Sequence, residues 1–409
     1  MENVSSRCGN RDNAPRLRFP EFNGEWMEKK IKEFANCYAG ATPSTKERKY
    51  WENGTIPWLS SGEVNKKHIS FTDNFITKIG YDSCSTKMIP ANTVVMALAG
   101  QGKTRGTVAI TEIELCTNQS LASIVTNETV DDKFLLYYLE TQYSNLRAIS
   151  SGDGTRGGLN LNIINEYSVF LASLPEQKKI AAFFTLLDRR IQKQRQFVEY
   201  LKTYKRGVIF SIFKEDNPFG IQIKKTPLSE LLTEYRNRNT ENLMVCSVAV
   251  GKGVVNQIEH LGRSFAAADT SNYGKVKPGD IVYTKSPTGN FPYGIVKQSR
   301  QKQDVAVSPL YGVYTPKSFS TGTLIHNYFE QSENANNYIR PLAQKGAKNT
   351  INITTSYFLQ GSIPFPVTED DVEKLANFFN LIDEKIQQTE IFLQNLSMQK
   401  KELLHRMFI

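Results

Sequence analysis

Apolar residues recur with a regular 3-4 spacing along two long stretches of the chain, residues 180–213 and 375–408. Eight of the ten spaced positions are apolar in each stretch, and the polar exceptions fall at the same two places. The stretches align without a gap at an offset of 195, and 11 of the 34 aligned pairs are identical. This pattern is typical of a coiled-coil seam and predicts two long helices that pack on each other. At 1.5 Å per residue, each helix is roughly 50 Å long.

The two predicted helices differ in charge. Residues 176–206 hold nine Lys/Arg against three Asp/Glu, whereas residues 369–406 hold five against eight. Net charges of +6 and −3 favour pairing of the two copies with each other over pairing of each with itself. The seam residues that we expect to pair the helices are Ile180, Phe184, Leu187, Ile191, Val198 and Leu201 in the first stretch, and Leu375, Phe379, Ile382, Ile386, Leu393 and Leu396 in the second.

The segments that precede the helices also repeat, more loosely. The pattern Pro-x-Asn-x-Val at 90–94 matches Pro-x-Asp-x-Val at 278–282, an offset of 188, and Asn-Ile-x-x-x-Tyr at 162–167 recurs at 352–357. Runs rich in Val, Ile and Tyr between Gly, Pro and Asn favour strands with a few helices. The predicted class is therefore α+β, with two pseudo-repeated globular α/β domains separated by the long helices. The predicted order is a disordered N-terminus (1–15), a first domain (16–174), a long helix with its linker (175–216), a second domain (217–366) and a second long helix (367–409).

Two loops occupy equivalent positions in the two domains but differ in chemistry. Predicted strands at 92–98 and 107–110 enclose residues 99–105, and those at 281–285 and 294–297 enclose residues 286–293. A second pair of loops follows at 150–160 and 344–352, and both members combine glycine with a cation and short polar side chains. Such loops approach phosphates through backbone N–H groups while their side chains reach base edges.

The composition limits the class of protein only loosely. A chain of 409 residues with 40% hydrophobic and 22% charged residues is an ordinary globular one, and its net charge of +9 points weakly to a polyanionic partner. Five scattered cysteines with no C-x-x-C suit free thiols in a reducing cytosol and leave no zinc site. No stretch approaches the ~18 apolar residues of a membrane span, and no apolar signal-peptide core follows Met1.

No motif for catalysis or for a cofactor emerges. Residues 100–104 (GQGKT) resemble part of a phosphate-binding loop, but Ala97 stands where that loop needs glycine, so a turn with an exposed cation is preferred. Residues 217–219 (NPF) resemble part of an amino-methyltransferase site but lack its second proline and a cofactor loop, so they are interpreted as a helix stop and linker. The four histidines lack metal-ligand spacing, and the acidic run at 369–371 fits helix capping. We expect no metal, no cofactor and no catalysis.

The beginnings of the first long helix and of the first domain resemble a known family. Residues 174–181 read LPEQKKIA and continue into Phe184-x-x-x-Asp188, while the second copy reads VEKLANFF from 372, with its proline, Pro366, further from the seam. Residues 40–44 (GATPS) and 56–62 (IPWLSSG) are similar to the start of a recognition domain, and residues 244–255 stand at the corresponding place in the second domain. Over essentially its whole length the chain resembles the specificity subunit of a type I restriction–modification system.

This resemblance implies two target-recognition domains at opposite ends of an antiparallel helix pair, related by a pseudo-two-fold axis that matches duplex DNA. It implies a cytoplasmic, non-catalytic subunit whose partners are double-stranded DNA, two methyltransferase subunits and restriction/translocase subunits. Because the two domains differ, the target is expected to consist of two unlike half-sites with an unread spacer. A helix pair of roughly 50 Å, less the overlap at each end, is near the ~34–36 Å between successive major-groove faces.

The candidates for DNA contact follow from loop position and chemistry: Lys103, Thr104, Arg105, Arg156, Lys285, Thr288, Asn290, Tyr293, Lys345, Lys348 and Asn349. Arginine and asparagine suit bidentate base contacts, and lysine suits phosphate. Trp51 and Trp58 are interpreted as core aromatics rather than as platforms for a displaced base. Two other hypotheses stay open, namely an enzyme with methylation or cleavage in this chain and a coiled-coil adaptor with no role on DNA.

Overall fold

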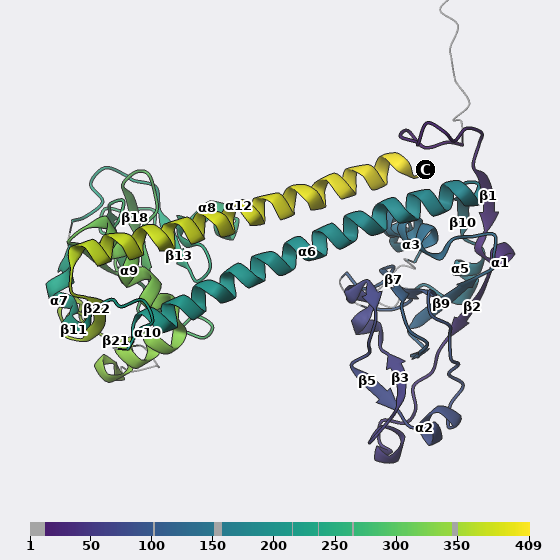
Figure 1. Ribbon diagram of the computed structural model, residues 1–409, viewed down its shortest axis with the longest axis horizontal. Helices are drawn as coiled ribbons and strands as arrows, with labels where there is room; N and C mark the ends of the chain where they lie inside the picture. Colours follow the sequence, from purple (N-terminus) through teal and green to yellow (C-terminus); the bar gives the residue numbers. More distant parts are fainter. Residues whose placement is uncertain are drawn as a thin grey trace, which may run out of the picture. The chain divides into compact units, whose positions relative to one another are not determined.

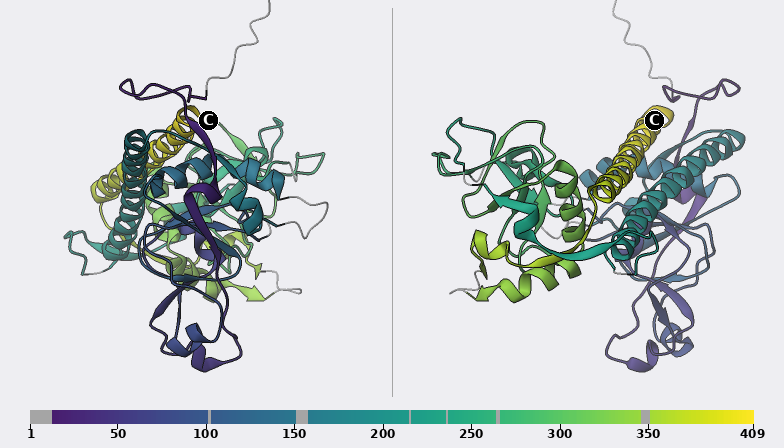
Figure 2. Two further views of the ribbon diagram at one scale, coloured as in Figure 1. Left: turned by 90° about the vertical axis from the view of Figure 1, so that its right-hand side faces the viewer. Right: turned by 60° about the vertical axis from the view of Figure 1, so that its left-hand side comes forward.

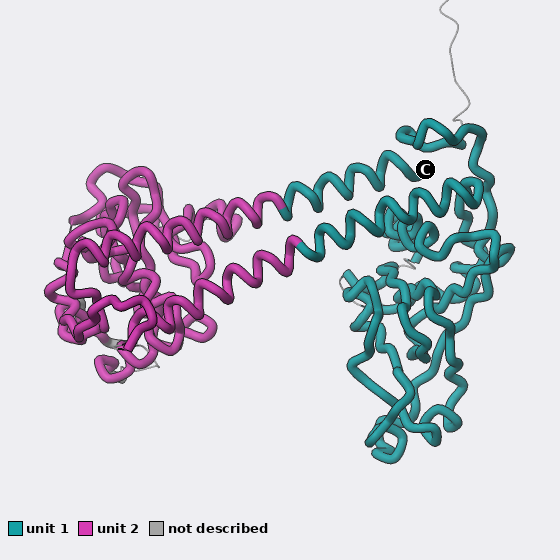
Figure 3. The backbone as a smooth tube through the Cα atoms, in the orientation of Figure 1, with its two compact units in different colours: residues 1–193, 393–409 teal, residues 194–392 magenta. Residues whose placement is uncertain are grey.

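The computed structural model describes residues 13–100, 103–150, 158–214, 216–235, 237–263, 266–345 and 351–409. The chain divides into two compact units (Figure 3). Unit 1 comprises residues 1–193 and 393–409, and unit 2 comprises residues 194–392. Each unit contains mixed sheets, short helices and a segment of both long helices, as the predicted α+β class requires (Figure 1).

Unit 1 is built on a five-stranded sheet in the order β2-β9-β6-β7-β4. Neighbouring strands are antiparallel except for β4 and β7, which are parallel. The strands of this sheet are β2 (Ala35–Ala39), β9 (Leu121–Thr126), β6 (Val94–Ala97), β7 (Val108–Thr111) and β4 (His68–Ile69). A second sheet has the order β5-β3-β8, with β5 (Asn74–Ile76), β3 (Ile56–Leu59) and β8 (Cys116–Thr117), and β1 (Met27–Lys30) pairs with β10 (Ser168–Leu171). The short helices are α1 (Ile31–Phe34), η1 (Arg48–Tyr50), η2 (Ser61–Lys66), α2 (Lys78–Asp82), α3 (Asp132–Thr141), α4 (Tyr143–Ile149) and α5 (Leu161–Asn165).

Strand β6 is apolar throughout because both of its faces are buried. Val94 and Met96 belong to the main core, which α3 covers, whereas Val95 and Ala97 point into a smaller core on the other face. Alternate side chains of a strand lie on opposite faces, so a strand between two cores needs a continuous apolar run. The predicted pair of strands around residues 92–98 and 107–110 is thereby confirmed as β6 and β7.

Unit 2 repeats this plan with a four-stranded sheet in the order β12-β19-β16-β17, in which all neighbours are antiparallel. Its strands are β12 (Leu232–Glu234), β19 (Gly312–Pro316), β16 (Ile281–Tyr283) and β17 (Val296–Gln298). Four two-stranded pairs accompany it: β11 (Ile223–Pro227) with β22 (Ser362–Pro366), β13 (Cys246–Ala249) with β14 (Gly253–Asn256), β15 (Gly274–Val276) with β18 (Val305–Val307), and β20 (Gln344–Lys345) with β21 (Ile351–Asn352). The short helices are α7 (Leu228–Leu231), α8 (Gln257–Leu261), α9 (Phe319–Glu330), α10 (Ser332–Ile339), η3 (Arg340–Leu342) and α11 (Thr355–Phe358).

The two long helices are α6 (Leu174–Ile212) and α12 (Glu369–Met407), each of 39 residues, and both bounds keep the offset of 195 (Figures 1 and 2). Pro175 lies in the first turn of α6, where its missing N–H is no loss. Before α12, the Thr368 hydroxyl accepts a hydrogen bond from the Asp371 N–H at 3.1 Å, and acidic residues fill the first turn. This capping starts α12 at residue 369, three residues before the motif at 372. The helix α6 ends at Ile212, before residues 217–219, and the Asn217 amide then donates to the Ile221 carbonyl at 2.6 Å, which closes a turn in the segment that follows.

Each long helix contributes one end to the core of each unit. In unit 1, Ile180 and Phe184 at the start of α6 share a core with Met407 and Phe408 at the end of the chain. In unit 2, the end of α6 and the start of α12 join the core in the same way through residues 208–213 and 372–379. The two helices are therefore antiparallel within each unit. All twelve predicted seam residues are buried or half-buried.

Candidate nucleic-acid interface

The two predicted loops of unit 1 emerge side by side at one end of β6. The Arg105 guanidinium donates to the Ser150 carbonyl and hydroxyl at 3.3 and 3.2 Å. The Leu159 N–H donates to the Leu98 carbonyl at 3.0 Å. The first contact fixes the start of the loop at 150–160, and the second fixes its end. Arg105 and Ser150, 45 residues apart in sequence, therefore bring the described ends of the two loops together.

The β6–β7 connection holds its three candidate residues in different settings. Lys103 is exposed, and its carbonyl accepts a hydrogen bond from the Tyr143 hydroxyl at 2.9 Å, which fixes the backbone and leaves the ammonium in solvent. Thr104 is half-buried, and Gly106, with φ +80°, closes the connection. Arg105 is half-buried, and its Nε is buried and finds no hydrogen-bond partner among the described residues. Arg156 lies outside the described residues.

The equivalent connection in unit 2, between β16 and β17, contains a tight turn at its tip. Thr288 and Phe291 exchange backbone hydrogen bonds of 3.0 and 2.9 Å across Gly289 and Asn290, so Thr288 and Asn290 are exposed at the tip. The Asn336 amide of α10 donates to the Asn290 carbonyl at 3.3 Å and supports this tip. Phe291 is buried beneath the tip and anchors it to the core.

Two further candidates lie at the base of this connection. Lys285 has a left-handed backbone, with φ +55°, and burial lowers the pKa of its half-buried ammonium. Tyr293 packs its ring against the core of unit 2, and its carbonyl accepts a hydrogen bond from the Tyr283 hydroxyl at 2.7 Å. The tip residues are thus presented outward, whereas Tyr293 is mainly a packing residue.

The second predicted loop of unit 2 is a hairpin. Strands β20 and β21 pair Gln344 with Asn352 and Lys345 with Ile351. The candidate Lys345 lies on β20, while Lys348 and Asn349 lie outside the described residues. The hairpin follows α10 and η3, the segment that also supports the Asn290 tip.

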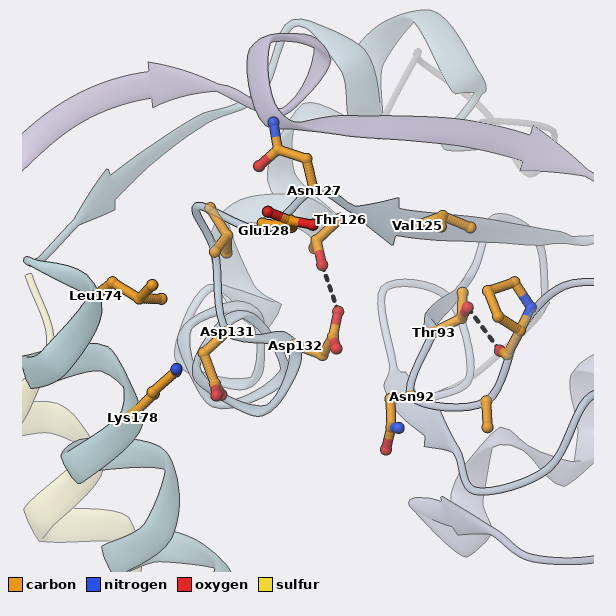
Figure 4. Close-up of a pocket in the computed structure, with 13 residues that line it drawn as sticks. Asn92, Thr93, Val125, Thr126, Asn127, Glu128, Asp131, Asp132, Leu174 and Lys178 are labelled. Carbon is orange, nitrogen blue, oxygen red and sulfur yellow. Dashed lines mark hydrogen bonds between the residues drawn. The ribbon is translucent and has the colours of Figure 1, made fainter.

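One pocket of unit 1 lies away from these loops and has a different character (Figure 4). Asn92 and Thr93, just before β6, and Thr126, at the end of β9, line it together with the start of α3. The Asp131 carboxylate caps α3, and Asp132 accepts a hydrogen bond from the Thr126 hydroxyl, while burial raises the pKa of Asp132. The loops leave β6 at its other end. Three carboxylate residues, Glu128, Asp131 and Asp132, line this pocket against one lysine, Lys178. This excess of negative charge disfavours a nucleic-acid phosphate, and we assign the pocket no part in the interface.

Of the predicted core aromatics, Trp58 lies on β3 of the smaller sheet of unit 1, and Trp51 follows η1 and packs against it. Trp58 is buried, Trp51 is half-buried, and their rings meet edge to face at 5.1 Å. The indole N–H groups of both donate to backbone carbonyls, at 3.1 Å to Ser44 and 3.0 Å to Ala41. Their interpretation as core residues is confirmed.

Sequence reasoning missed a set of exposed apolar residues on the long helices. Leu186 is 63% exposed and its counterpart Leu381 is 65% exposed. Phe197 and its counterpart Phe392 are 41% and 42% exposed. The signal was available, because both pairs are identical across the repeat and both lie outside the predicted seam. Large apolar side chains that recur on a solvent face indicate a surface for a protein partner.

Within the described ranges, no helix is long and apolar enough to cross a membrane, and no group of three or more His, Cys, Asp or Glu residues is placed to hold a metal ion. The four cysteines described, Cys37, Cys84, Cys116 and Cys246, are free thiols.

Comparison with known proteins agrees with this architecture. Residues 23–199 match the model of the type I restriction modification DNA specificity domain. The chain is 25% identical over 213 residues to the EcoR124I/EcoR124II specificity subunit of Escherichia coli, covering 49% of this chain and 51% of that one. It is 29% identical over 200 residues to the MjaIX specificity subunit of Methanocaldococcus jannaschii, covering 48% of this chain and 45% of that one. The chain thus spans about half the length of the curated relatives it matches.

The fold extends the likeness beyond the matched residues. The crystal structure of a type I restriction–modification system S subunit from M. genitalium superposes with a TM-score of 0.62 at 14% identity, covering 97% of this chain and 99% of that one. The class is therefore a two-unit α+β protein with long pairing helices. In sequence, residues 23–199 match the type I restriction modification DNA specificity domain, and about half of the chain is similar to type I specificity subunits.

Proposed function

We propose that the chain is the DNA-recognition subunit of a type I restriction–modification complex, without catalysis of its own. In this proposal each unit reads one half-site of a bipartite, asymmetric DNA target, and the methyltransferase and restriction/translocase subunits supply the chemistry. The complex acts on DNA in the cytoplasm.

The observation that carries the proposal is the chemical difference between loops at equivalent places. Gly106 and Gly294 match across the repeat, and both have a left-handed backbone, with φ +80° and +97°, at the ends of the β6–β7 and β16–β17 connections. The enclosed residues differ, because Lys103 is the exposed cation in unit 1, whereas Thr288 and Asn290 form the exposed tip in unit 2. A common scaffold with unlike tips suits two half-sites of different sequence.

Recovery of duplexes from a randomised pool tests this directly. The chain, assembled with its methyltransferase subunits, is expected to select two short invariant blocks separated by a spacer of fixed length and free sequence. Thr288→Ala/Asn290→Ala is expected to relax one block and leave the other intact. Lys252→Ala, which removes an exposed cation of unit 2 outside both loops, is the matched control. One contiguous block, or no selection at all, would contradict two-unit recognition.

The repeated exposed leucines support a scaffold for two methyltransferase subunits. A repeated surface presents the same apolar side chain twice, once from Leu186 in unit 1 and once from Leu381 in unit 2. We expect Leu186→Asp or Leu381→Asp to leave one methyltransferase subunit per chain and the double variant to leave none, as measured by native mass spectrometry. Leu310→Asp, at an equally exposed leucine of unit 2 outside the helices, is the control. Full binding by the double variant would place the docking surface elsewhere.

The competing hypotheses predict different results. An enzyme with its own methylation activity transfers methyl groups to DNA as the isolated chain. A coiled-coil adaptor without a DNA role shows no selection from the pool even when the complex is assembled.

A further inference from the structure

Each unit buries one cluster of lysines and carboxylates where the two long helices meet. In unit 1 the Lys400 ammonium lies 2.6 Å from the Asp188 carboxylate, and Lys67 contacts the same carboxylate at 2.9 Å and Glu140 at 2.7 Å. The Tyr137 hydroxyl donates a further hydrogen bond to Asp188 at 2.9 Å. The side chain of Lys400 is only 9% exposed, so this charge depends on its partners.

Unit 2 contains the equivalent cluster. The Lys205 ammonium lies 2.6 Å from Asp383 and 2.7 Å from Glu330, and its side chain is 7% exposed. Lys297 lies 3.7 Å from Glu330. Lys205 and Asp383 are the repeat counterparts of Lys400 and Asp188 at the offset of 195. The two clusters are therefore products of the same duplication.

In both clusters the lysine and the aspartate come from different long helices. Lys400 of α12 meets Asp188 of α6, and Lys205 of α6 meets Asp383 of α12. The third member comes from a helix of the globular part, Glu140 from α3 and Glu330 from α9. One buried cluster thus joins both long helices and the globular part of the same unit at a single point.

The apolar seam cannot define the helix register by itself. Its positions repeat every seven residues, so a slip of one heptad replaces leucine, isoleucine and valine by similar residues. The same slip displaces each buried lysine by roughly 10 Å along the helix and leaves it buried without a carboxylate. A polar residue in a coiled-coil seam is known to fix register in this way, at some expense in stability.

We propose that Lys205 and Lys400 are positioning residues that fix the register of α6 against α12 and, through it, the number of base pairs between the two half-sites. The role of the two lysines in the helix register stands on the contacts alone, and the link from register to base-pair spacing rests on the proposed function. The clusters are unequal, because Lys67 bridges both carboxylates of unit 1 beside Lys400, whereas Lys205 alone bridges both carboxylates of unit 2. Loss of Lys205 is therefore expected to loosen the register more than loss of Lys400.

The register is measured without DNA on the full chain with its native cysteines replaced. Nitroxide labels at the exposed positions Glu199 on α6 and Gln387 on α12 report the distance between the helices in unit 2. We expect one narrow distribution in the parent chain and, in Lys205→Met/Lys400→Met, a second population displaced by a heptad, roughly 10 Å. Lys205→Arg/Lys400→Arg is expected to restore the single population.

Lys202→Met is the matched control, since Lys202 pairs with Glu390 across the same helices at 2.8 Å but keeps 39% of its side chain exposed. A single narrow distribution in the double methionine variant would overturn the proposal. If the double variant does not fold, the single variants Lys205→Met and Lys400→Met are compared, of which Lys400→Met keeps Lys67. Label distances that are equally narrow in both single variants would likewise overturn the proposal.

The link between register and DNA spacing is tested by measuring the affinity of the assembled complex for duplexes that carry both half-sites. The spacers in these duplexes range from two base pairs shorter to two base pairs longer than the spacer recovered from the randomised pool. We expect the parent complex to prefer one spacer about tenfold or more, and the double methionine variant to lose most of that preference. A broadened register with unchanged spacer preference would refute the link to DNA spacing and leave the register assignment standing. A parent complex indifferent to spacer would refute the proposed function, while the label distances still decide the register.

Discussion

Phe408 is the residue through which the end of α12 closes the core of unit 1, and its removal has a measurable consequence. The side chain is 5% exposed, and its ring centroid lies 5.3 Å from Phe134, 5.9 Å from Phe184, 6.0 Å from Tyr138 and 6.1 Å from Trp26. Phe408→Ala removes the ring from all four neighbours. Phe→Ala in a core costs about 3–5 kcal/mol, and we expect about 3 kcal/mol here.

The expected loss is large enough to be seen by calorimetry of the full chain. For a unit of this size each kcal/mol shifts the melting temperature by roughly 2–4 °C, so unfolding of unit 1 should begin roughly 6–12 °C lower. Hydrogen exchange should show loss of protection in α3, which carries Phe134 and Tyr138. Phe210→Ala is the control, because Phe210 on α6 is 61% exposed and its loss should stay within about 0.5 kcal/mol. Equal effects of the two variants would refute closure of the unit 1 core by the end of α12.

Two further predictions concern unit 2. Gly294→Ala should destabilise unit 2 by about 1–3 kcal/mol in denaturant unfolding, because Gly294 has φ +97° and an added Cβ would lie 2.9 Å from the backbone nitrogen of Lys285. The control is Gly207→Ala on α6, where the added Cβ meets open space and should leave stability unchanged or raise it. A larger loss of stability in Gly207→Ala than in Gly294→Ala would contradict the described turn. Burial alone would raise the pKa of Glu330, but Lys205, His326 and Lys297 lower it to about 2. The ionised Glu330 carboxylate therefore contributes fully to the stability of unit 2 above about pH 4.5, and this contribution is lost as the pH falls towards 2. Unfolding measured at pH 7, 4.5 and 3 should show this loss, and Glu330→Gln should flatten it; an unchanged pH dependence in Glu330→Gln would contradict the ion cluster.

The long helices were predictable because one pattern appears twice. The identical pairs across the repeat located both helices, but the seam begins only at Ile180 and Leu375. The earlier starts depend on Pro175 and on the cap from Thr368, which are local backbone effects outside the apolar period.

The candidate interface was predictable in position and less so in detail. The strands around the loops followed from their apolar runs, and the loops emerged where those strands end. In the structure, Tyr293 packs on the core, whereas Thr288 and Asn290 are exposed. This difference depends on the turn between Thr288 and Phe291, which the spacing of residues along the sequence does not reveal.

The buried ion clusters were beyond sequence reasoning for a different reason. Lys67, Glu140, Asp188 and Lys400 come from four distant parts of the chain, and only the folded unit brings them together. The repeat identified Lys205 and Lys400 as polar residues in the seam but gave no partner for either.

Base-resolved adenine methylation across the genome tests the central claim most directly. Cells that express this chain with its modification partner are compared with cells that lack the chain. If this chain recognises a split target, cells that express it gain one new methylated motif, made of two short unlike blocks at a fixed spacing. An unchanged methylome, with the complex shown to be assembled, would contradict it.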